Sequence, residues 1–371
     1  MRVLIAPDSF KGSLTAPQAA EALSRGWQRA RPGDEITALP LADGGEGTVE
    51  ALMAALGGEW RTTRVAGPLG SPVEARWALL GGGDTALVEM AAASGLMLVP
   101  EDRRNPLHTS TFGTGELLRA ALEAGARTIL LGIGGSATND GGAGMAQALG
   151  FRLLRRDGSV FATPASGQDL ENIARVDGTA VHPALREARI RVACDVDNPL
   201  TGPEGAAHVY GPQKGATPDI VRRLDAGLHT WARAVEAAVG QDYSTVPGAG
   251  AAGGLGFALQ TLCGAELVSG INLVLDALRF SERTREASLV LTGEGRIDSQ
   301  TMRGKTIAGV VRRAGEAGVP VWAFAGKSEV ERLDGIERLY EIRSLCDSDR
   351  EAMDRAGELL EQLAARAAEG L

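Results

Sequence analysis

The sequence predicts an α/β fold with a parallel sheet, and three observations lead to this prediction. The chain opens on a short apolar strand, Arg2 to Ala6, which a polar loop joins to an amphipathic helix over residues 16–29. The same order of strand, glycine-rich loop and helix follows at once, with its strand at 36–41. It returns near the carboxyl terminus, where strands are expected at 288–292 and 319–325. Such alternation is typical of parallel sheets that helices cover.

The helix boundaries carry their own signals. Thr15 and Gln18 have the spacing of a capping box, and Pro17 stands in the first turn, where its missing N–H is harmless. A second helix is expected at 49–56, because the Gly57-Gly58 pair that follows can end it. The remaining helices expected in these parts of the chain lie at 306–317 and 348–369.

The middle of the chain has a different pattern. Residues 72–80 and 85–90 predict two strands, and the glycines of segment 81–84 between them are typical of a hairpin. The other elements expected here are a strand at 128–132 and helices at 113–124 and 219–239. We therefore predict a second α/β domain inserted into a Rossmann-like one. The predicted boundaries are 71–280 for the insert and, for the Rossmann-like domain, 1–70 and 281–371.

Composition and charge exclude several classes of function. Of 371 residues, 44% are hydrophobic and 23% charged, which is typical of a globular protein with room for two cores. Acidic side chains number 47 against 38 basic ones, and the net charge of -9 would repel a nucleic-acid backbone. Aromatic residues, which stack on bases, make up only 4%. We expect no nucleic-acid partner, whereas a nucleotide or small anion needs only local cations and backbone amides.

Signals for cellular location indicate the cytoplasm. Cys194, Cys263 and Cys346 form no CxxC pair, so neither a disulfide framework nor a thiolate metal site is expected. The first apolar run is too short for a signal peptide. No run approaches the roughly 18 apolar residues of a membrane span. We expect a cytoplasmic protein that has no membrane partner.

Glycine is abundant, at 50 residues, and gathers at the ends of expected strands. At such ends of a parallel sheet, glycine lets the backbone approach a phosphate, and helix amino termini present N–H groups. Each cluster alone is more often a tight turn, but four clusters that also carry hydroxyls and carboxylates favour a ligand. The clusters are 44–47, 132–142, 248–256 and 293–298.

Two familiar nucleotide motifs are not satisfied. Residues 248–253 match GxGxxG in letters, but segment 243–247 before them is a poor buried strand, so we expect a tight turn or substrate loop. Segment 304–306 ends like a P-loop, yet Ser299 stands where the first glycine is required. The four histidines do not have the spacing of metal ligands, and the chain has no serine motif of the GxSxG type. Acid–base chemistry is therefore left to carboxylates.

The loop carboxylates and lysines favour phosphoryl transfer. That reaction needs amides and lysines to neutralise phosphate, carboxylates to hold magnesium through water, and a carboxylate to orient the attacking hydroxyl. Each such residue alone is more often a cap, turn or surface residue. The carboxylates are Asp8, Asp43, Glu46, Asp140, Asp195, Asp197, Glu294 and Asp298, and the lysines are Lys11, Lys305 and Lys327.

Six motifs follow one another along the chain, at 5–13, 42–48, 132–142, 194–200, 211–216 and 292–298. Together they resemble the type-1 glycerate kinase family of bacterial glycolate and glucarate breakdown. The resemblance extends from about residue 2 to 330, nearly the whole chain. One departure is Lys327, which follows Gly326 where relatives often have a small hydroxyl residue, and this argues against a phosphate role for Lys327.

The resemblance implies a cytoplasmic kinase of organic-acid and glycolate/glyoxylate metabolism. It implies that ATP and Mg²⁺ serve to phosphorylate D-glycerate, with 2-phosphoglycerate as the product. It also implies a Rossmann-like domain, a second α/β domain of unusual topology, and an active site in the cleft between them.

Site roles are expected on the same basis. Asp195 is our candidate for the base that orients the hydroxyl, and Lys11 and Asp43 complete the expected catalytic group. Arg296 or Lys11 is expected to bind the glycerate carboxylate or the transferring phosphate. The expected Mg²⁺ ligands are Asp298 and Glu294. The other expected substrate- and phosphate-binding residues are Asp8, Ser9, Ser13, Gly44, Gly45, Glu46, Gly47, Thr48, Gly134, Gly135, Ser136, Thr138, Asn139, Asn198 and Lys305.

Alternatives to this function are also considered. Transfer to the 3-hydroxyl would give 3-phosphoglycerate, and the sequence does not distinguish the two hydroxyls. A nucleotide-sensing homologue without catalysis is a second alternative, although the loop carboxylates and Lys11 are intact. A nicotinamide oxidoreductase would need a fingerprint after the first strand, which is missing. The sequence leaves the oligomeric state open, with a homodimer as one expectation.

Overall fold

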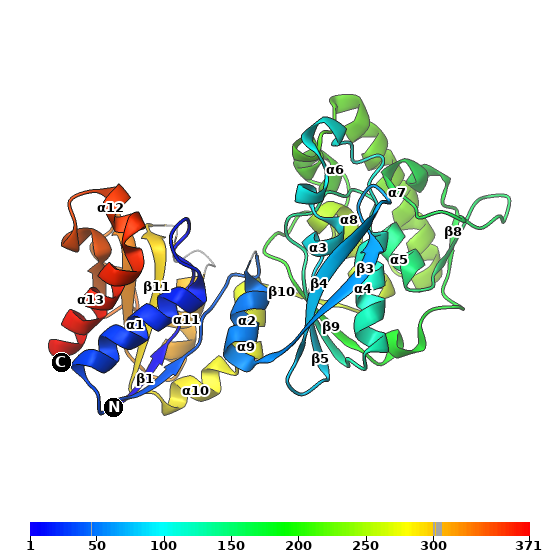
Figure 1. Ribbon diagram of the computed structural model, residues 1–371. Helices are drawn as coiled ribbons and strands as arrows, with labels where there is room; N and C mark the ends of the chain where they lie inside the picture. The colour runs from blue at the N-terminus through cyan, green and yellow to red at the C-terminus, as the bar shows by residue number, and fades with distance from the viewer. Residues whose placement is uncertain (46, 300, 302–305) are drawn as a thin grey trace. The chain divides into compact units, whose positions relative to one another are not determined.

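The computed structural model describes residues 1–45, 47–299, 301 and 306–371. These residues form two compact units. The first unit joins the two ends of the chain, Met1–Gly57 and Ser269–Leu371, and the second is the continuous segment Gly58–Val268. Figure 1 shows that each unit contains a sheet with helices packed around it.

The first unit is built on a five-stranded parallel sheet. Its strands are β1 (Arg2–Ile5), β2 (Glu35–Ala38), β11 (Leu289–Ile297), β12 (Val321–Ser328) and β13 (Arg338–Glu341). They are ordered β13-β12-β11-β1-β2, so strands from the two ends of the chain are neighbours. Val3 pairs with Leu289 on one side and with Ile36 on the other. The parallel α/β arrangement expected for this part of the chain is confirmed.

Helices cover both faces of this sheet. On β12, Trp322 lies in one buried core and Ala323 in another, because successive side chains of a strand point to opposite faces. Trp27 of the first helix shares the core of Trp322, and Ile307 shares the core of Ala323. The helices of this unit are α1 (Ala16–Ala30), α2 (Thr48–Leu56), α9 (Gly270–Ala277), α10 (Phe280–Glu286), α11 (Thr306–Glu316), α12 (Asp349–Asp354) and α13 (Ala356–Glu369).

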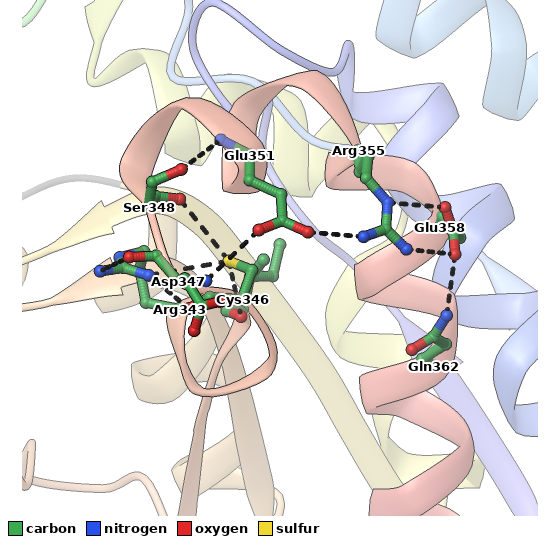
Figure 2. A network of polar contacts seen from close by, with 9 residues as sticks. Arg343, Cys346, Asp347, Ser348, Glu351, Arg355, Glu358 and Gln362 are labelled. Carbon is green, nitrogen blue, oxygen red and sulfur yellow. Dashed lines mark hydrogen bonds and ion pairs between the residues drawn. The ribbon is translucent and has the colours of Figure 1, made fainter.

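The long helix expected at 348–369 is divided into α12 and α13. Arg355, between them, leaves the helical conformation with φ −114° and ψ 20°. Ser348 caps α12 by accepting a hydrogen bond from the backbone N–H of Glu351. Figure 2 shows how the Arg355 guanidinium joins the two helices, with ion pairs of 2.6 Å to Glu351 and 2.7 Å to Glu358. The single helix that we expected is therefore wrong in this detail.

The second unit contains a six-stranded mixed sheet. Its strands are β3 (Gly58–Ala66), β4 (Pro72–Leu80), β5 (Thr85–Glu89), β6 (Thr128–Gly132), β9 (Arg189–Ala193) and β10 (Glu266–Val268). They are ordered β10-β9-β6-β5-β4-β3. β5, β6, β9 and β10 run parallel, whereas β3, β4 and β5 pair antiparallel, which confirms the expected hairpin of β4 and β5. A separate small sheet pairs β7 (Arg152–Leu154) with β8 (Arg175–Asp177).

Helices of the second unit flank this sheet. The helices predicted at 113–124 and 219–239 are confirmed as α4 and α7. Residues 243–247 form no strand, as expected when the dinucleotide fingerprint was rejected. The helices are α3 (Ala91–Ser94), α4 (Phe112–Glu123), α5 (Ala143–Ala148), α6 (Ala206–Tyr210), α7 (Pro218–Val239) and α8 (Ala251–Leu262).

The chain passes between the units at two points. β3 pairs with β4 in the second sheet, so the second unit begins at Gly58, and the first unit resumes at Ser269, before α9. We predict from the sequence that the inserted domain begins after residue 70 and ends at residue 280. These domain boundaries stay a prediction. Within the described ranges, none of the helices combines the length and apolar character that a bilayer crossing requires.

Candidate active site

Asp8 lies just beyond the carboxyl end of β1, where a parallel sheet commonly binds its ligands. Its backbone N–H donates a 2.8 Å hydrogen bond to the carbonyl of Gly293 on β11. Its carboxylate accepts hydrogen bonds from the Ser9 backbone N–H, at 2.6 Å, and from the Thr306 hydroxyl. Burial raises the pKa of Asp8 above its ordinary value, the nearby charge of Asp43 adds to the rise, and the hydrogen bonds oppose it. The structure thus brings Asp8 and Asp43 into electrostatic contact.

Asp43 follows β2 at the same edge of the sheet. It is exposed, and its Oδ1 accepts a 3.0 Å hydrogen bond from the backbone N–H of Gly45. The Thr48 hydroxyl donates to the Gly45 carbonyl at 2.8 Å, and Gly47, directly before α2, has φ +88°. That left-handed conformation favours glycine. The loop 43–48 therefore ends in a helix amino terminus, as the glycine pattern predicted.

Glu294, Asp298 and Thr301 form a hydrogen-bonded group at the end of β11. The Thr301 hydroxyl donates to Glu294 Oε1 at 2.9 Å and accepts from the backbone N–H of Asp298 at 3.0 Å. Thr301 is buried, whereas Glu294 and Asp298 are half-buried. The Thr301 hydroxyl therefore links the Glu294 carboxylate to the backbone of Asp298, a contact that the sequence analysis missed.

These carboxylates fit a magnesium site that substrate would complete. Within the described ranges, no three His, Cys, Asp or Glu side chains gather as a ready-made metal cage. Mg²⁺ binds through one or two carboxylates and keeps waters and substrate phosphates as its other ligands. Glu294 and Asp298 supply two oxygen-bearing side chains of this kind. The donor set suits Mg²⁺ better than a soft metal.

Lys11 lies in a tight loop beside β11. Phe10 and Leu14 exchange two backbone hydrogen bonds of 2.9 Å, which close the loop. Lys11 lies between these two residues and is exposed. Gly295 of β11 lies under this loop, because a Cβ there would be 3.1 Å from the Lys11 backbone nitrogen. Arg296, the neighbouring cation, forms an exposed ion pair of 2.5 Å with Glu329. An anion that binds Arg296 would have to share or displace Glu329.

In the second unit, the loop between β6 and α5 begins with an open half. Gly134 and Gly135 are exposed, and Ser136 is half-exposed. Gly135 has φ +69°, a conformation that favours glycine. The segment is supported by short contacts with residues 94–96: the Leu96 N–H donates to the Gly135 carbonyl at 2.8 Å, and the Ala137 N–H donates to the Ser94 carbonyl at 2.9 Å. This half can present backbone amides to an anion.

The other half of the same loop is completely buried. The Asp140 carboxylate accepts hydrogen bonds from the backbone N–H and hydroxyl of Thr111, at 2.7 and 2.8 Å, and from the N–H groups of Gly142 and Gly144, at 3.1 and 3.3 Å. Its carboxylate thus binds backbone N–H groups at the amino termini of both α4 and α5. Burial raises the pKa of Asp140, and these hydrogen bonds oppose the rise. Asp140 is structural in this arrangement, whereas Thr138 Oγ1 and Asn139 Oδ1 are buried and find no hydrogen-bond partner among the described residues.

Asp195 and Asn198 lie on the loop that follows β9, the strand beside β6. Asp195 and Asp197 are exposed. Asn198 is held from two sides, since its Oδ1 accepts a 2.5 Å hydrogen bond from Tyr210 and its Nδ2 donates to the Glu204 carbonyl at 2.8 Å. Because β6 and β9 run parallel and adjacent, their two following loops start from the same edge of the sheet.

The glycine segment after residue 247 packs against both of these loops. A Cβ on Gly250 would lie 2.2 Å from the Pro199 carbonyl, and one on Gly253 would lie 2.0 Å from the Thr138 carbonyl. Ala252, Gly253 and Gly254 are all left-handed, which bends the chain at the start of α8. The expected tight turn is therefore present, and it joins the two loops within the second unit.

The comparisons with known proteins decide the family. A model of the glycerate kinase family matches residues 3–371. The chain belongs to the glycerate kinase family. It is 50% identical over 366 residues to a glycerate kinase of Halalkalibacterium halodurans, covering 98% of this chain and 96% of that one. It is 45% identical to the glycerate 2-kinase of Escherichia coli K12, covering 100% and 99%. A crystal structure assigned as glycerate kinase 2 of Salmonella typhimurium LT2 has a TM-score of 0.91 and 45% identity, covering 100% and 98%.

In this member of the glycerate kinase family, the expected site residues fall into one group per unit. Glu46 and Lys305 lie outside the described residues. The sequence analysis assigned no role to Thr301, Thr306 or Lys214. A signal was available for Lys214, which lies in one of the six motifs, whereas isolated threonines give none. The expected residues of the first unit are Asp8, Ser9, Lys11, Ser13, Asp43, Gly44, Gly45, Gly47, Thr48, Glu294, Arg296 and Asp298, and those of the second are Gly134, Gly135, Ser136, Thr138, Asn139, Asp195 and Asn198.

Proposed function

We propose that this protein transfers the γ-phosphoryl group of ATP to the 2-hydroxyl of D-glycerate and releases 2-phosphoglycerate and ADP. The observation that carries the proposal is the end-to-end likeness to a relative named glycerate 2-kinase, at 45% identity. The arrangement of the site is consistent with it. Carboxylates lie at the strand ends of the first unit, and a glycine loop with open amides lies in the second.

Asp195 is proposed as the base. As an exposed carboxylate directly after β9, it can accept the proton of the glycerate 2-hydroxyl as that oxygen attacks the γ-phosphorus. The bond from the γ-phosphorus to the bridging oxygen of ADP breaks as the new bond forms. Asp195 would hold the proton at a carboxylate oxygen and later release it to water.

Cations and amides are proposed to bind the charged groups of the substrates. Lys11 is exposed on its loop and can neutralise the transferring phosphoryl group, which carries charge on its outer oxygens. Arg296 can bind the glycerate carboxylate in place of Glu329. The amides around Gly134 and Gly135 are proposed to bind a further anionic group.

Glu294 and Asp298 are the residues proposed to hold Mg²⁺. The ion supplies positive charge beside the phosphate oxygens. The Thr301 hydroxyl orients the Glu294 carboxylate and holds the backbone N–H of Asp298. Asp8 and Asp43 add negative charge where β1 and β2 end. They are proposed to contact the bound ATP or its metal ion through water. The protein is proposed to work in the cytoplasm, and a homodimer is the assembly to test first.

A coupled assay tests the proposal and its main alternative. Purified protein, ATP, Mg²⁺ and D-glycerate are incubated with enolase, which uses 2-phosphoglycerate, and the formation of phosphoenolpyruvate is followed. We expect it to form without added phosphoglycerate mutase. Product that enolase uses only after mutase is added would assign transfer to the 3-hydroxyl. ATP binding without any glycerate-dependent product would favour the nucleotide-sensing alternative.

A further inference from the structure

Lys214 is a buried cation without a role in the proposed reaction. It ends a short 3-10 turn, Pro212–Lys214, and is 1% exposed. A lysine ammonium is almost never buried in this way without a polar partner. Its Nζ donates a 2.6 Å hydrogen bond to the main-chain carbonyl of Thr138. Burial lowers the pKa of Lys214 to about 7, and the charge of Asp140 opposes the shift.

The glycines around Lys214 explain how its side chain reaches the interior. Gly215 has φ +93°, and a Cβ on it would lie 2.2 Å from the Arg104 carbonyl. A Cβ on Gly211 would lie 2.3 Å from the Ala207 carbonyl. Both backbones are therefore packed closely against their neighbours. The motif 211–216 thus forms a tight turn that directs one lysine inward.

Lys214 holds the loop at a point where the loop's own side chains leave two oxygens unsatisfied. Thr138 Oγ1 and Asn139 Oδ1 have no hydrogen-bond partner in the described part of the chain, and both residues are 0% exposed. The side-chain amide nitrogen of Asn139 donates a long hydrogen bond of 3.3 Å to the Ala206 carbonyl. Further along, the loop is secured by Asp140 and by Trp231, whose Nε1–H donates to the Gly141 carbonyl at 2.8 Å.

The open half of the loop ends only two residues before Thr138. Gly134, Gly135 and Ser136 are accessible, whereas residues 137–142 are buried. A loop that binds an anion through its amides gains affinity when those amides are held in place before the ligand arrives. The fixed half therefore anchors the carboxyl-terminal end of the open half, whose middle is held by the contacts with residues 94–96.

We propose that Lys214 is a positioning residue, which fixes the Thr138 carbonyl and thereby holds residues 134–136 in the geometry that binds an anionic group of a substrate. The inference rests on the proposed function, in which this loop binds substrate. The anion is a phosphate of ATP or the carboxylate of D-glycerate, and the kinetic arms of the experiment distinguish these two. Lys214 itself touches no reacting atom.

The test compares Lys214→Met with Val235→Ala. The methionine keeps the length of the side chain but removes the charge and the donor. Val235 is fully buried in α7, in the core of the same unit, and its apolar side chain makes no hydrogen bond to the loop. Val235→Ala therefore measures the effect of a comparable loss of stability without the loss of a polar contact. For each variant, KM and kcat are measured with ATP and with D-glycerate varied in turn, together with the unfolding midpoint. Hydrogen exchange is measured on peptides that cover 134–144.

We expect Lys214→Met to lower kcat/KM about 100-fold for the substrate whose anion the loop binds, because a small displacement of a binding group has an effect of this size. Exchange should become faster at 134–142 and stay unchanged in the rest of the second unit. Val235→Ala should lower the unfolding midpoint and leave kcat/KM within about threefold of the parent.

Three outcomes would overturn the inference. The first is unchanged exchange at 134–142 in Lys214→Met, whatever its activity. The second is faster exchange with unchanged kinetics. The third is a loss of kcat/KM in Val235→Ala as large as that in Lys214→Met, when the two variants have the same unfolding midpoint. If the parent chain does not phosphorylate glycerate, the proposed function fails, and the exchange comparison alone then decides whether Lys214 fixes the loop.

Discussion

The hydroxyl of Thr306 donates a hydrogen bond to Oδ2 of Asp8, although 298 positions separate the two residues in the chain. Thr306 is the first residue of α11, and Asp8 follows β1. The bond therefore ties the start of a late helix to the end of the first strand. It also explains why Asp8 can be desolvated, because the carboxylate keeps two donors when it leaves water.

Replacing Asp8 tests its raised pKa. The neutral form of a carboxyl with a raised pKa is favoured in the folded state, so stability is lost as pH rises from the unfolded-state pKa of about 4 through the folded one. Asp8→Asn removes this loss. We expect the variant to gain stability relative to the parent as pH rises. Its free energy of unfolding minus that of the parent, measured by urea unfolding, should be larger at pH 7 than at pH 4. A difference that is equal at both pH values, or larger at pH 4, would contradict the assignment.

Asp195→Asn should leave the fold intact and reduce turnover by about 10²–10⁴-fold, the usual contribution of a general base. Asp197 is the matched control, because it is an exposed carboxylate two residues away on the same loop. Asp197→Asn should stay within a few-fold of the parent. Steady-state kinetics and circular dichroism of both variants make the comparison. Turnover of Asp195→Asn close to that of the parent would remove Asp195 from this role.

Much of the fold could be predicted from sequence because its signals are local. The capping box at Thr15 and Gln18 is formed as predicted, and the hairpin of β4 and β5 lies where glycines 81–83 indicated it. The edge strand β3 was missed. Apart from the buried Val65, its side chains are exposed or half-exposed and give little hydrophobic alternation. Arg355 was likewise expected inside a helix, although its ion pairs with two glutamates stabilise a break.

The site was predictable in its loops but not in its contacts. Glycines and carboxylates mark 43–48, 132–142 and 293–298 in the sequence. The described residues of these segments lie at or beyond the carboxyl ends of β2, β6 and β11. Hydrogen bonds such as that of Thr301 to Glu294 depend on the three-dimensional path of the chain after β11. The residue pattern does not predict that path. Asp140 was grouped with the candidate loop carboxylates, yet its buried position between two helix starts gives it a structural role.

Gly253→Ala should destabilise the second unit strongly. At φ +73° an alanine is strained, and its Cβ would lie 2.0 Å from the Thr138 carbonyl. Gly264 is the matched control, because it has φ +63° and nothing within 4 Å of a Cβ. Gly264→Ala should cost about 1–2 kcal/mol from backbone strain alone, and Gly253→Ala should cost about 1–3 kcal/mol more from the clash. Urea unfolding measures both, and equal losses would show that the close approach is unimportant.

Removal of magnesium should abolish activity, and Asp298→Asn should raise the Mg²⁺ concentration for half-maximal rate by about 10–100-fold, as loss of a metal-site carboxylate usually does. Asp334→Asn, at an exposed carboxylate elsewhere in the first unit, is the control and should leave the Mg²⁺ dependence unchanged. Rates are measured over a Mg²⁺ titration at saturating ATP and D-glycerate. An identical titration curve for Asp298→Asn would exclude Asp298 as a ligand.

The most direct test of the account is phosphorus NMR of a reaction mixture that contains the purified protein, ATP, Mg²⁺ and D-glycerate. We predict that the γ-phosphate signal of ATP declines only when D-glycerate is present, while one equivalent each of ADP and 2-phosphoglycerate appears. Decline of ATP at the same rate without D-glycerate, or the absence of any phosphoglycerate signal, would contradict the account.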